Sequence, residues 1–216
     1  MKLTSKKLVD ELVSRYPELD CCHKSVLNSV QTIIDSYQSE GKLLVCGNGG
    51  SAADALHIVG ELMKSFVLPR LLDDDLQRDI HTTYPETAEY LTDNLQGALP
   101  AIALVNEVSL ITAYSNDAAP DLSFAQQVVG FGKKGDVLVA ISTSGNSKNV
   151  LYATQMAKVL GMQVIGLTGQ DGGKLKDLCD EAILVPSNET YKIQEYHLPI
   201  YHAICLAVEN EFFGGK

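Results

Sequence analysis

Apolar residues in this chain follow two patterns, helical periods and short uninterrupted runs. They recur every three or four positions over residues 8–16 and again over residues 26–37, where Gly41 marks a C-terminal stop. Short apolar runs then alternate with helical segments, at residues 43–46, 101–105, 137–141, 163–167 and 182–185. Runs without alternation are typical of strands buried on both faces of a parallel sheet. The pattern predicts an α/β protein with a doubly wound, mostly parallel five-stranded sheet flanked by helices, including two N-terminal helices.

The length of 216 residues suits a single large domain, so we treat residues 1–216 as one unit with a helical segment over residues 1–41. These leading helices precede the first strand, and a partner subunit is one surface on which they could pack. Residues 67–97 interrupt the pattern with prolines and three consecutive aspartates, although residues 86–95 are compatible with a short helix. A connection this long is either a functional loop or lid, or a surface insertion without a role.

A glycine-rich turn follows the first apolar run. Gly47, Gly49 and Gly50 permit a sharp turn, and Ser51 stands where a helix N-cap is expected. Such a turn presents free backbone N–H groups and the positive end of the helix dipole to an anion, so we expect a phosphate site. The same glycines fit a relaxed dinucleotide fingerprint. However, the acidic residues at the required distance lie in a polar stretch rather than at a strand end, which disfavours a nicotinamide enzyme.

A second candidate phosphate loop spans residues 142–147, which read Ser-Thr-Ser-Gly-Asn-Ser before a predicted helix over residues 148–160. Ligands of parallel sheets bind beyond the carboxyl ends of the strands, and both loops lie at such ends. Hydroxyl and backbone N–H groups can surround a phosphate without lysine or arginine. Two such loops on one sheet favour phosphate binding over ordinary helix caps.

Titratable residues lie on two predicted helices. His57 and Glu61 are four residues apart and therefore share one helix face, just beyond the first loop. The last helix, predicted over residues 194–213, carries Gln194, His197 and His202. Histidines on helices are mostly structural. These would gain a chemical role only if their helix returned to the pocket of His57 and Glu61, which spacing alone does not show.

The formal net charge of −10 disfavours nucleic-acid binding, because nucleic-acid phosphates need cationic partners. No apolar run approaches the roughly 20 residues of a membrane span, and the start of the chain has no apolar signal core. The five cysteines are odd in number and form no C-x-x-C motif, so we expect reduced thiols and a cytoplasmic protein that does not bind membranes.

Six motifs occur together in chain order. They are Cys-Gly-Asn-Gly-Gly-Ser at 46–51, His57 with Glu61, Ser-Asn-Asp at 115–117, Ile-Ser-Thr-Ser-Gly-Asn-Ser at 141–147, Leu-Thr-Gly-x-Asp-Gly-Gly-Lys at 167–174, and Ile-Gln-Glu at 193–195 with His202. This set resembles the sugar isomerase (SIS) domain of the phosphoheptose isomerase family. The resemblance covers most of the chain outside residues 67–97. It implies an aldose–ketose isomerase that converts sedoheptulose 7-phosphate to D-glycero-D-manno-heptose 7-phosphate through a cis-enediol.

The resemblance also implies roles for individual residues. Those expected to bind the sugar phosphate are Asn48, Gly49, Gly50, Ser51, Glu61, Asn116, Asp117, Ser142, Thr143, Ser144, Ser147 and Gln194. Glu61 and His202 would be the catalytic acid–base pair. Zinc would be bound by His57, Glu61, Gln194 and His202. The family forms homotetramers with sites shared between subunits, which would also ease the rise of about 12 Å between Gln194 and His202 on one helix.

The chain departs from the family pattern at several positions. Tyr191 and Lys192 stand where the family usually has Asp and Arg, Gly60 replaces an acidic residue, Ser65 replaces an Arg, and residues 67–97 replace a short turn. These changes leave the phosphate motifs intact but bear on which sugar is used. The alternative function is a non-catalytic sugar-phosphate-binding or regulatory SIS protein. Such members usually lack the terminal histidine, whereas this chain keeps His202.

Overall fold

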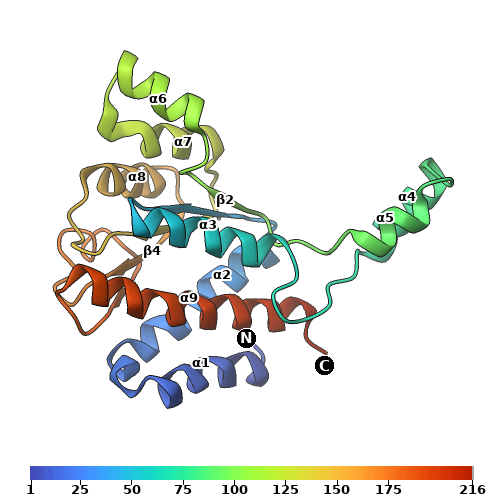
Figure 1. Ribbon diagram of the computed structural model, residues 1–216, viewed down its shortest axis with the longest axis horizontal. Helices are drawn as coiled ribbons and strands as arrows, with labels where there is room; N and C mark the ends of the chain where they lie inside the picture. The colour runs from blue at the N-terminus through green and yellow to red at the C-terminus, as the bar shows by residue number, and fades with distance from the viewer. Residues whose placement is uncertain (216) are drawn as a thin grey trace.

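A five-stranded sheet lies at the centre of the structure, a computed structural model in which residues 1–215 are described (Figure 1). All pairings are parallel, in the order β2-β1-β3-β4-β5. The strands are β1 (Leu43–Cys46), β2 (Ala101–Ala103), β3 (Val137–Ile141), β4 (Gln163–Thr168) and β5 (Glu181–Leu184). The predicted fold class is confirmed, and each strand lies within two residues of its expected bounds.

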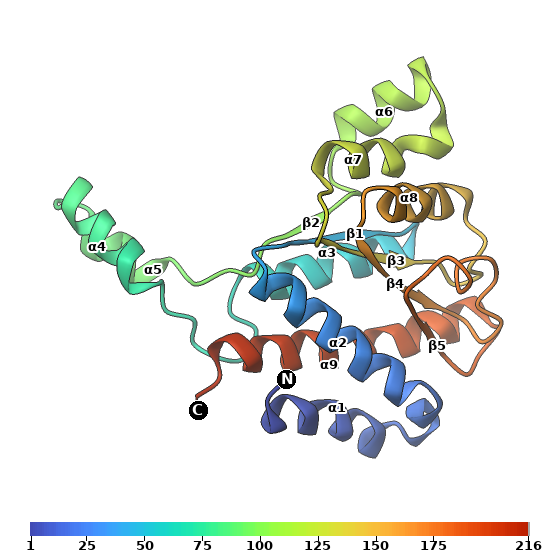
Figure 2. The same cartoon turned by 180° about the vertical axis from the view of Figure 1, so that it is seen from behind.

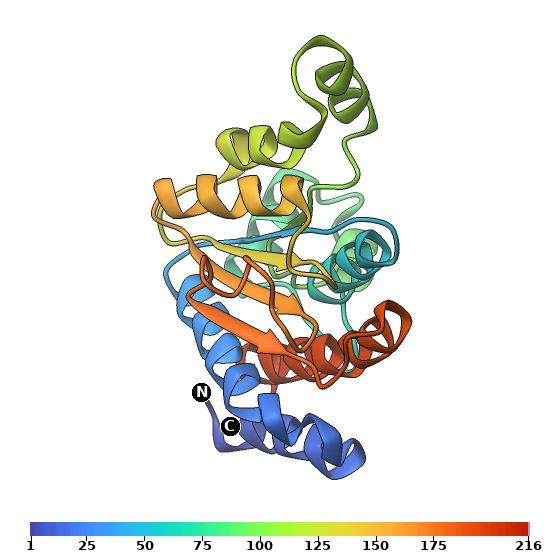
Figure 3. The same cartoon turned by 90° about the vertical axis from the view of Figure 1, so that its left-hand side faces the viewer.

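Alternate side chains of the strands enter two separate cores. In β1, Leu43 and Val45 face one core, whereas Leu44 and Cys46 face the other. Helices cover both faces (Figures 1 and 3). On the first face lie α1 (Leu3–Arg15), α2 (His23–Gln38), α3 (Gly50–Met63) and α9 (Thr190–Phe213). On the second lie α7 (Ser123–Phe131) and α8 (Lys148–Val159), and α6 (Val108–Asp117) packs on α7 further from the sheet. Burial on both faces explains why the strand sequences show no apolar–polar alternation.

The two leading helices pack within their own chain. α1 lies along α9, and α2 contacts α9 and the β5 edge of the sheet (Figure 2). Val9 and Leu12 of α1, with Val26 and Val30 of α2, are buried in this layer. A 3-10 turn, η1 (Pro17–Cys22), joins the two helices, and a second, η2 (Pro120–Leu122), precedes α7. The packing surface that we considered for a partner subunit is therefore supplied by α9 and the sheet.

Residues 67–97 hold two helices rather than a loop with one short helix. α4 (Asp74–Thr83) and α5 (Ala88–Asn94) form a hairpin that projects from the body, as Figures 1 and 2 show. The Asp73 carboxylate accepts from the N–H of Asp75 at 2.9 Å and caps α4. The aspartate run that we read as a break is thus a helix start. The ends of the hairpin meet where Gly97 N–H donates to the Arg70 carbonyl at 3.0 Å.

The last helix, α9, begins at Thr190, four residues before its predicted start, and continues through Pro199. It is the longest helix of the described chain and lies beside α3 on the same face of the sheet (Figure 1). No helix within residues 1–215 has both the length and the apolar character needed to cross a membrane. α9 is instead an internal helix whose side chains reach the first core.

We predict that the hairpin contributes little to stability. α4 has no buried residue, and α5 has one, Ala88. Replacing residues 73–94 with a short glycine–serine linker should lower the melting temperature by less than about 4 °C in scanning calorimetry. As a control, Leu138→Ala in the buried β3 should cost about 2–5 kcal/mol. A loss from linker replacement as large as that from Leu138→Ala would contradict the prediction.

Candidate functional site

The first phosphate loop connects β1 to α3. Gly49 has φ of 56° and ψ of −120° and occupies the N-cap position of α3, a conformation that favours glycine. A Cβ on Gly47 would lie 2.6 Å from the Ser51 carbonyl oxygen, so this turn has no room for a side chain. Ser51 is buried within the first helical turn and makes no cap hydrogen bond. The prediction that Ser51 is the N-cap is therefore wrong, because the glycine conformation starts the helix two residues earlier.

The second loop leaves the adjacent strand at the same edge. β1 and β3 pair directly, with Cys46 opposite Ala140, so residues 47–51 and 142–147 emerge side by side. The hydroxyls of Ser142 and Ser147 are 3.0 Å apart, and Gly145 has φ of 63°. The α8 helix begins directly after this loop, so two helix N-termini point to one place.

A reciprocal amide pair joins the two loops. Asn48 Nδ2 donates to Asn149 Oδ1 at 2.9 Å, and Asn149 Nδ2 donates to Asn48 Oδ1 at 2.8 Å. Sequence reasoning identified Asn48 but missed Asn149, which lies just outside the serine-rich motif. Its only sequence signal is an amide in the first turn of the helix that follows. The pair holds the two candidate phosphate loops in a fixed relation.

Gln194 lies at the start of α3. A Cβ on Gly50 would be 2.4 Å from Gln194 Nε2, so the amide of Gln194 covers this glycine. The structure thus brings Gln194 to the first candidate phosphate loop, a contact that the spacing of residues in the sequence could not predict. It does not bring Gln194 to the histidines of the same chain, because His202 lies eight residues further along α9.

A cluster of polar side chains lies further along α3. His57 Nε2 is 3.1 Å from Glu61 Oε1, and His57 Nδ1 is 2.9 Å from the hydroxyl of Tyr201. The rings of His57 and His202 meet edge to face, with centroids 5.1 Å apart. The structure therefore brings His57, Glu61 and His202 together. Sequence reasoning missed the contact of Tyr201 with His57, although Tyr201 directly precedes His202.

His202 is the unsatisfied member of this cluster. Its Nε2 atom is buried and has no hydrogen-bond partner among residues 1–215. Desolvation and the neighbouring His57 lower the pKa of His202, and the Glu61 carboxylate opposes this shift. A lowered pKa keeps the imidazole neutral near pH 7, which is the form that accepts a proton. The Tyr201 hydroxyl has a raised pKa, mainly because of desolvation, and stays protonated.

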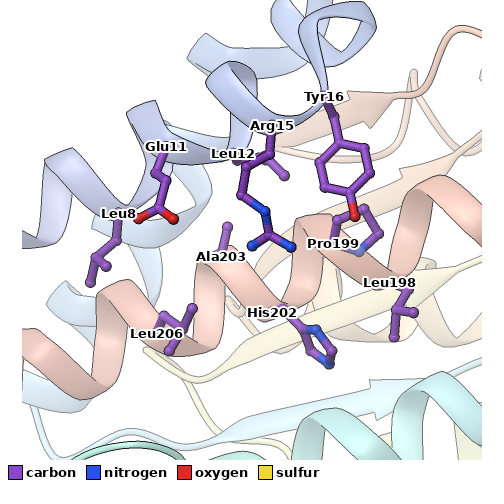
Figure 4. A pocket seen from close by; sticks show the side chains of 10 residues that line it. All are labelled: Leu8, Glu11, Leu12, Arg15, Tyr16, Leu198, Pro199, His202, Ala203 and Leu206. Atoms are coloured by element: carbon purple, nitrogen blue, oxygen red, sulfur yellow. The ribbon is translucent and has the colours of Figure 1, made fainter.

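A cavity of about 210 Å³ adjoins this cluster between α1 and α9 (Figure 4). Arg15 and Glu11 of α1 extend towards α9 across it, and His202 lies at its edge with its ring turned away from α1. The positive charge of Arg15 also contributes to the lowered pKa of His202. The α1 helix thus affects the electrostatics of the cluster, a contribution that the sequence pattern did not indicate.

Asn116 and Asp117 are not brought to the loops within one chain. Both are exposed at the end of α6, on the opposite face of the sheet from α3, and the Asn116 amide donates to the Asp117 carboxylate at 2.8 Å.

Tyr191 and Lys192, two departures from the family pattern, both bond Glu189 at the surface. Neither side chain has a hydrogen bond to residues 47–51 or 142–147 among the bonds of the described chain.

The residues expected to bind zinc fit one ion only in part. His57, Glu61 and His202 gather at one place, and His202 Nε2 is free to bind. Gln194 of the same chain lies at Gly50 instead. Within residues 1–215, no three His, Cys, Asp or Glu side chains are arranged as a metal site. Both ring nitrogens of His57 already have hydrogen-bond partners, which accounts for part of this misfit.

Comparison with known proteins agrees with this geometry. Residues 89–169 match the family model of the SIS domain, a class to which the paired loops at one edge of a parallel sheet also point. A phosphoheptose isomerase from Nitratiruptor sp. is 44% identical over 179 residues, 83% of this chain and 82% of that protein. One from Clostridium acetobutylicum is 40% identical over 193 residues, 89% of this chain and 85% of that protein.

Comparison with solved structures points to the same family. The structure of a phosphoheptose isomerase from Francisella tularensis matches with a TM-score of 0.73 and 31% identity, over 91% of both chains. That of the enzyme from Neisseria gonorrhoeae matches with a TM-score of 0.70 and 32% identity, over 96% of this chain and 92% of that one. This chain belongs to the phosphoheptose isomerase family.

His197 is fully buried and has a structural rather than a chemical role. Its burial leads to a prediction about how stability depends on pH. Neither ring nitrogen has a partner within the described chain, and burial lowers the pKa of His197 to about 4. Between pH 6.5 and 4 the unfolded state binds a proton that the folded state does not, so stability is lost as the pH falls through this range. This residue should contribute a loss of about 2–3 kcal/mol in the free energy of unfolding between pH 7 and 4.5.

Denaturant titrations at the two pH values measure this loss. His197→Leu should reduce the pH dependence by that amount, whereas replacing the exposed His81 of α4 with Gln should leave it unchanged. An unchanged pH dependence in His197→Leu would show that protonation of this ring does not oppose folding.

Proposed function

We propose that this protein interconverts sedoheptulose 7-phosphate and D-glycero-D-manno-heptose 7-phosphate. The observation that carries the proposal is that one helix, α3, begins at the paired phosphate loops and ends beside the His57, Glu61 and His202 cluster. A phosphate and a reactive carbonyl of one ligand can therefore be held at two ends of the same helix. Family membership supports the same reaction.

The dimensions of α3 suit an extended sugar phosphate. Ser51 and Glu61 are ten residues apart, which corresponds to at most about 15 Å of axial rise. A phosphate at the two helix N-termini leaves the sugar chain to run along α3 towards Glu61. In this arrangement Asn48, Gly49, Gly50, Ser51 and the hydroxyls of 142–147 bind the phosphate end, and Gln194 lies beside it.

The isomerisation moves one proton between adjacent carbons and one between their oxygens. In the ketose-to-aldose direction a proton leaves C1, the C1–C2 bond gains double-bond character as a cis-enediol, and C2 then receives a proton. The hydroxyl proton moves from O1 to O2. We assign these transfers to Glu61 and His202, since a carboxylate and a neutral imidazole suit proton transfer near neutral pH. The lowered pKa of His202 supports its part as a proton acceptor.

We propose that the full site needs a second subunit. Asn116 and Asp117 lie away from the loops of their own chain, and Gln194 lies away from the histidines. A homotetramer with shared sites, as the resemblance implies, would let these residues reach a neighbouring site. We also place the protein in the cytoplasm, which its five free thiols support.

We propose zinc as a cofactor, bound by His57, Glu61 and His202 with a Gln194 from a neighbouring subunit. The support is the unpartnered Nε2 of His202 beside His57 and Glu61. When bound, zinc would polarise the sugar carbonyl. A carboxylate that binds zinc tightly is a weaker base, so the two roles expected of Glu61 oppose each other.

We predict that the serine loop holds the phosphate. Replacing Ser142 and Ser144 together by Ala should weaken binding of sedoheptulose 7-phosphate by roughly 1–3 kcal/mol, because each lost hydroxyl leaves a charged acceptor less satisfied. Isothermal titration calorimetry measures the change. Ser14→Ala in the exposed part of α1 is the control. Equal affinities in the double variant and the control would rule out this placement of the phosphate.

We predict that Glu61 and His202 are required for turnover but not for binding. Glu61→Gln and His202→Ala should each slow conversion at least about a hundredfold, since two proton transfers need two groups. Both variants should keep the thermal shift on adding substrate, because the phosphate loops remain intact. Normal turnover in either variant would remove that residue from the mechanism. Binding of the sugar phosphate without conversion by the unaltered protein would favour the sugar-phosphate sensor.

Metal content tests the zinc proposal. Protein purified without a His-tag should contain close to one zinc per subunit by elemental analysis, and His57→Ala should lose it. Glu195→Gln, on the exposed side of α9, should keep it. A metal-free protein with full activity would remove zinc from the site and leave Glu61 and His202 as the acid and base.

A further inference from the structure

The C-terminal end of α3 is held by a side chain from outside the helix. The last carbonyl groups of a helix have no partner within it, and after Met63 the chain becomes extended at Lys64. Arg70 supplies donors instead. Its Nη2 donates to the Glu61 carbonyl at 2.8 Å and its Nη1 to the Leu62 carbonyl at 2.6 Å. A cation at this end also suits the helix dipole.

Arg70 is held in turn by Glu209 of α9. The Nε of Arg70 donates to Glu209 Oε1 at 2.8 Å, and both side chains are fully buried. The Glu209 carboxylate also accepts from the backbone N–H groups of residues 66, 67 and 68, at 2.8, 3.0 and 3.2 Å. The ring of Phe213 lies 4.9 Å from the Arg70 guanidinium and closes this side. Each polar atom of the pair thus has a defined partner.

The pair joins the two helices that carry the proposed acid and base. His202 and Glu209 are seven residues apart and therefore lie on the same face of α9, two turns apart. Glu61 offers its backbone carbonyl to Arg70, while its carboxylate contacts His57 beside His202. A shift of α3 along α9 would break the Arg70 bonds and move the Glu61 carboxylate relative to His202.

We propose that Arg70 and Glu209 are positioning residues for the isomerase reaction. They fix the end of α3 against α9 and so set the distance between the Glu61 carboxylate and the His202 ring. The inference rests on the proposed function, in which Glu61 and His202 exchange protons with the sugar. Small displacements of reacting groups cost large factors in rate.

The chemistry of the pair favours positioning over simple stabilisation. A buried ion pair is weak evidence for stability, because apolar residues of similar volume often pack as well. What apolar residues cannot provide is a planar set of donors that holds two successive carbonyl groups in fixed directions. Arg70 uses three separate nitrogens for three separate acceptors on α3 and α9.

The test uses three variants of the full-length protein. Arg70→Met removes the donors and leaves Glu209 without its cation. The double variant Arg70→Met with Glu209→Gln also removes the unpaired charge. Arg70→Lys keeps the charge but cannot reach all three acceptors, and it serves if Arg70→Met does not fold. Each is measured for melting temperature, for kcat and KM with sedoheptulose 7-phosphate, and for ligand binding by calorimetry.

The matched control is Asp136→Asn. Asp136 is also buried, also pairs with a cation, Lys42 at 2.6 Å, and also accepts from backbone N–H groups, of Lys42 and Lys133. It lies directly before β3, away from the histidine cluster, so its loss should lower the melting temperature without changing kcat. This separates general destabilisation from displacement of Glu61.

We expect kcat to fall at least about tenfold in Arg70→Lys and in the double variant, with KM changed less than about threefold. The double variant should regain part of the melting temperature lost in Arg70→Met without regaining kcat. Unchanged kcat in these variants would overturn the proposal. So would an equal fall of kcat in Asp136→Asn, because the loss of kcat would then follow from destabilisation alone. If the unaltered protein did not convert the sugar phosphate, the proposed function would fail first. If Glu61→Gln is inactive while the Arg70 variants are normal, only the positioning role is lost.

Discussion

The direct pairing of β1 and β3 is the constraint on which the proposed phosphate site depends. Because the two strands are parallel neighbours, the turns that follow them leave at one edge, and each turn opens a helix. The Asn48–Asn149 amide pair then fixes the two turns to each other. Two helix N-termini and several hydroxyls therefore lie at one edge of the sheet, where backbone N–H and hydroxyl groups can bind a phosphate.

The second constraint is the parallel course of α3 and α9. Gln194 lies over Gly50, His202 beside His57, and Glu209 bonds the backbone just beyond the end of α3. The two helices therefore remain in contact from the proposed phosphate end of the site to its far end. Within one chain, Gln194 lies at the start of α3 and His202 lies beside His57, further along the same helix.

The sequence predicted the parts of the structure that depend on local chemistry. Unbroken apolar runs indicated buried strands, and three glycines indicated a sharp turn between a strand and a helix. It could not place Gln194 or Tyr201, because their contacts depend on how α9 lies on α3 rather than on spacing within α9. Our interpretation of Asp73 as part of a break was also wrong. From sequence alone, an aspartate that caps a helix cannot be distinguished from one in a loop, because the difference is the hydrogen bond to Asp75. The Arg70–Glu209 pair joins residues 139 positions apart and left no local signal.

In the mechanism that we propose, α3 holds the phosphate at its start and directs proton transfer near its end. The most direct measurement is NMR of sedoheptulose 7-phosphate incubated with the protein in deuterium oxide. Proton abstraction through an enediol predicts deuterium on the carbons that exchange hydrogen, together with formation of the aldoheptose phosphate. Binding of the sugar phosphate without deuterium incorporation or conversion would contradict this mechanism, because the phosphate site would then serve recognition alone.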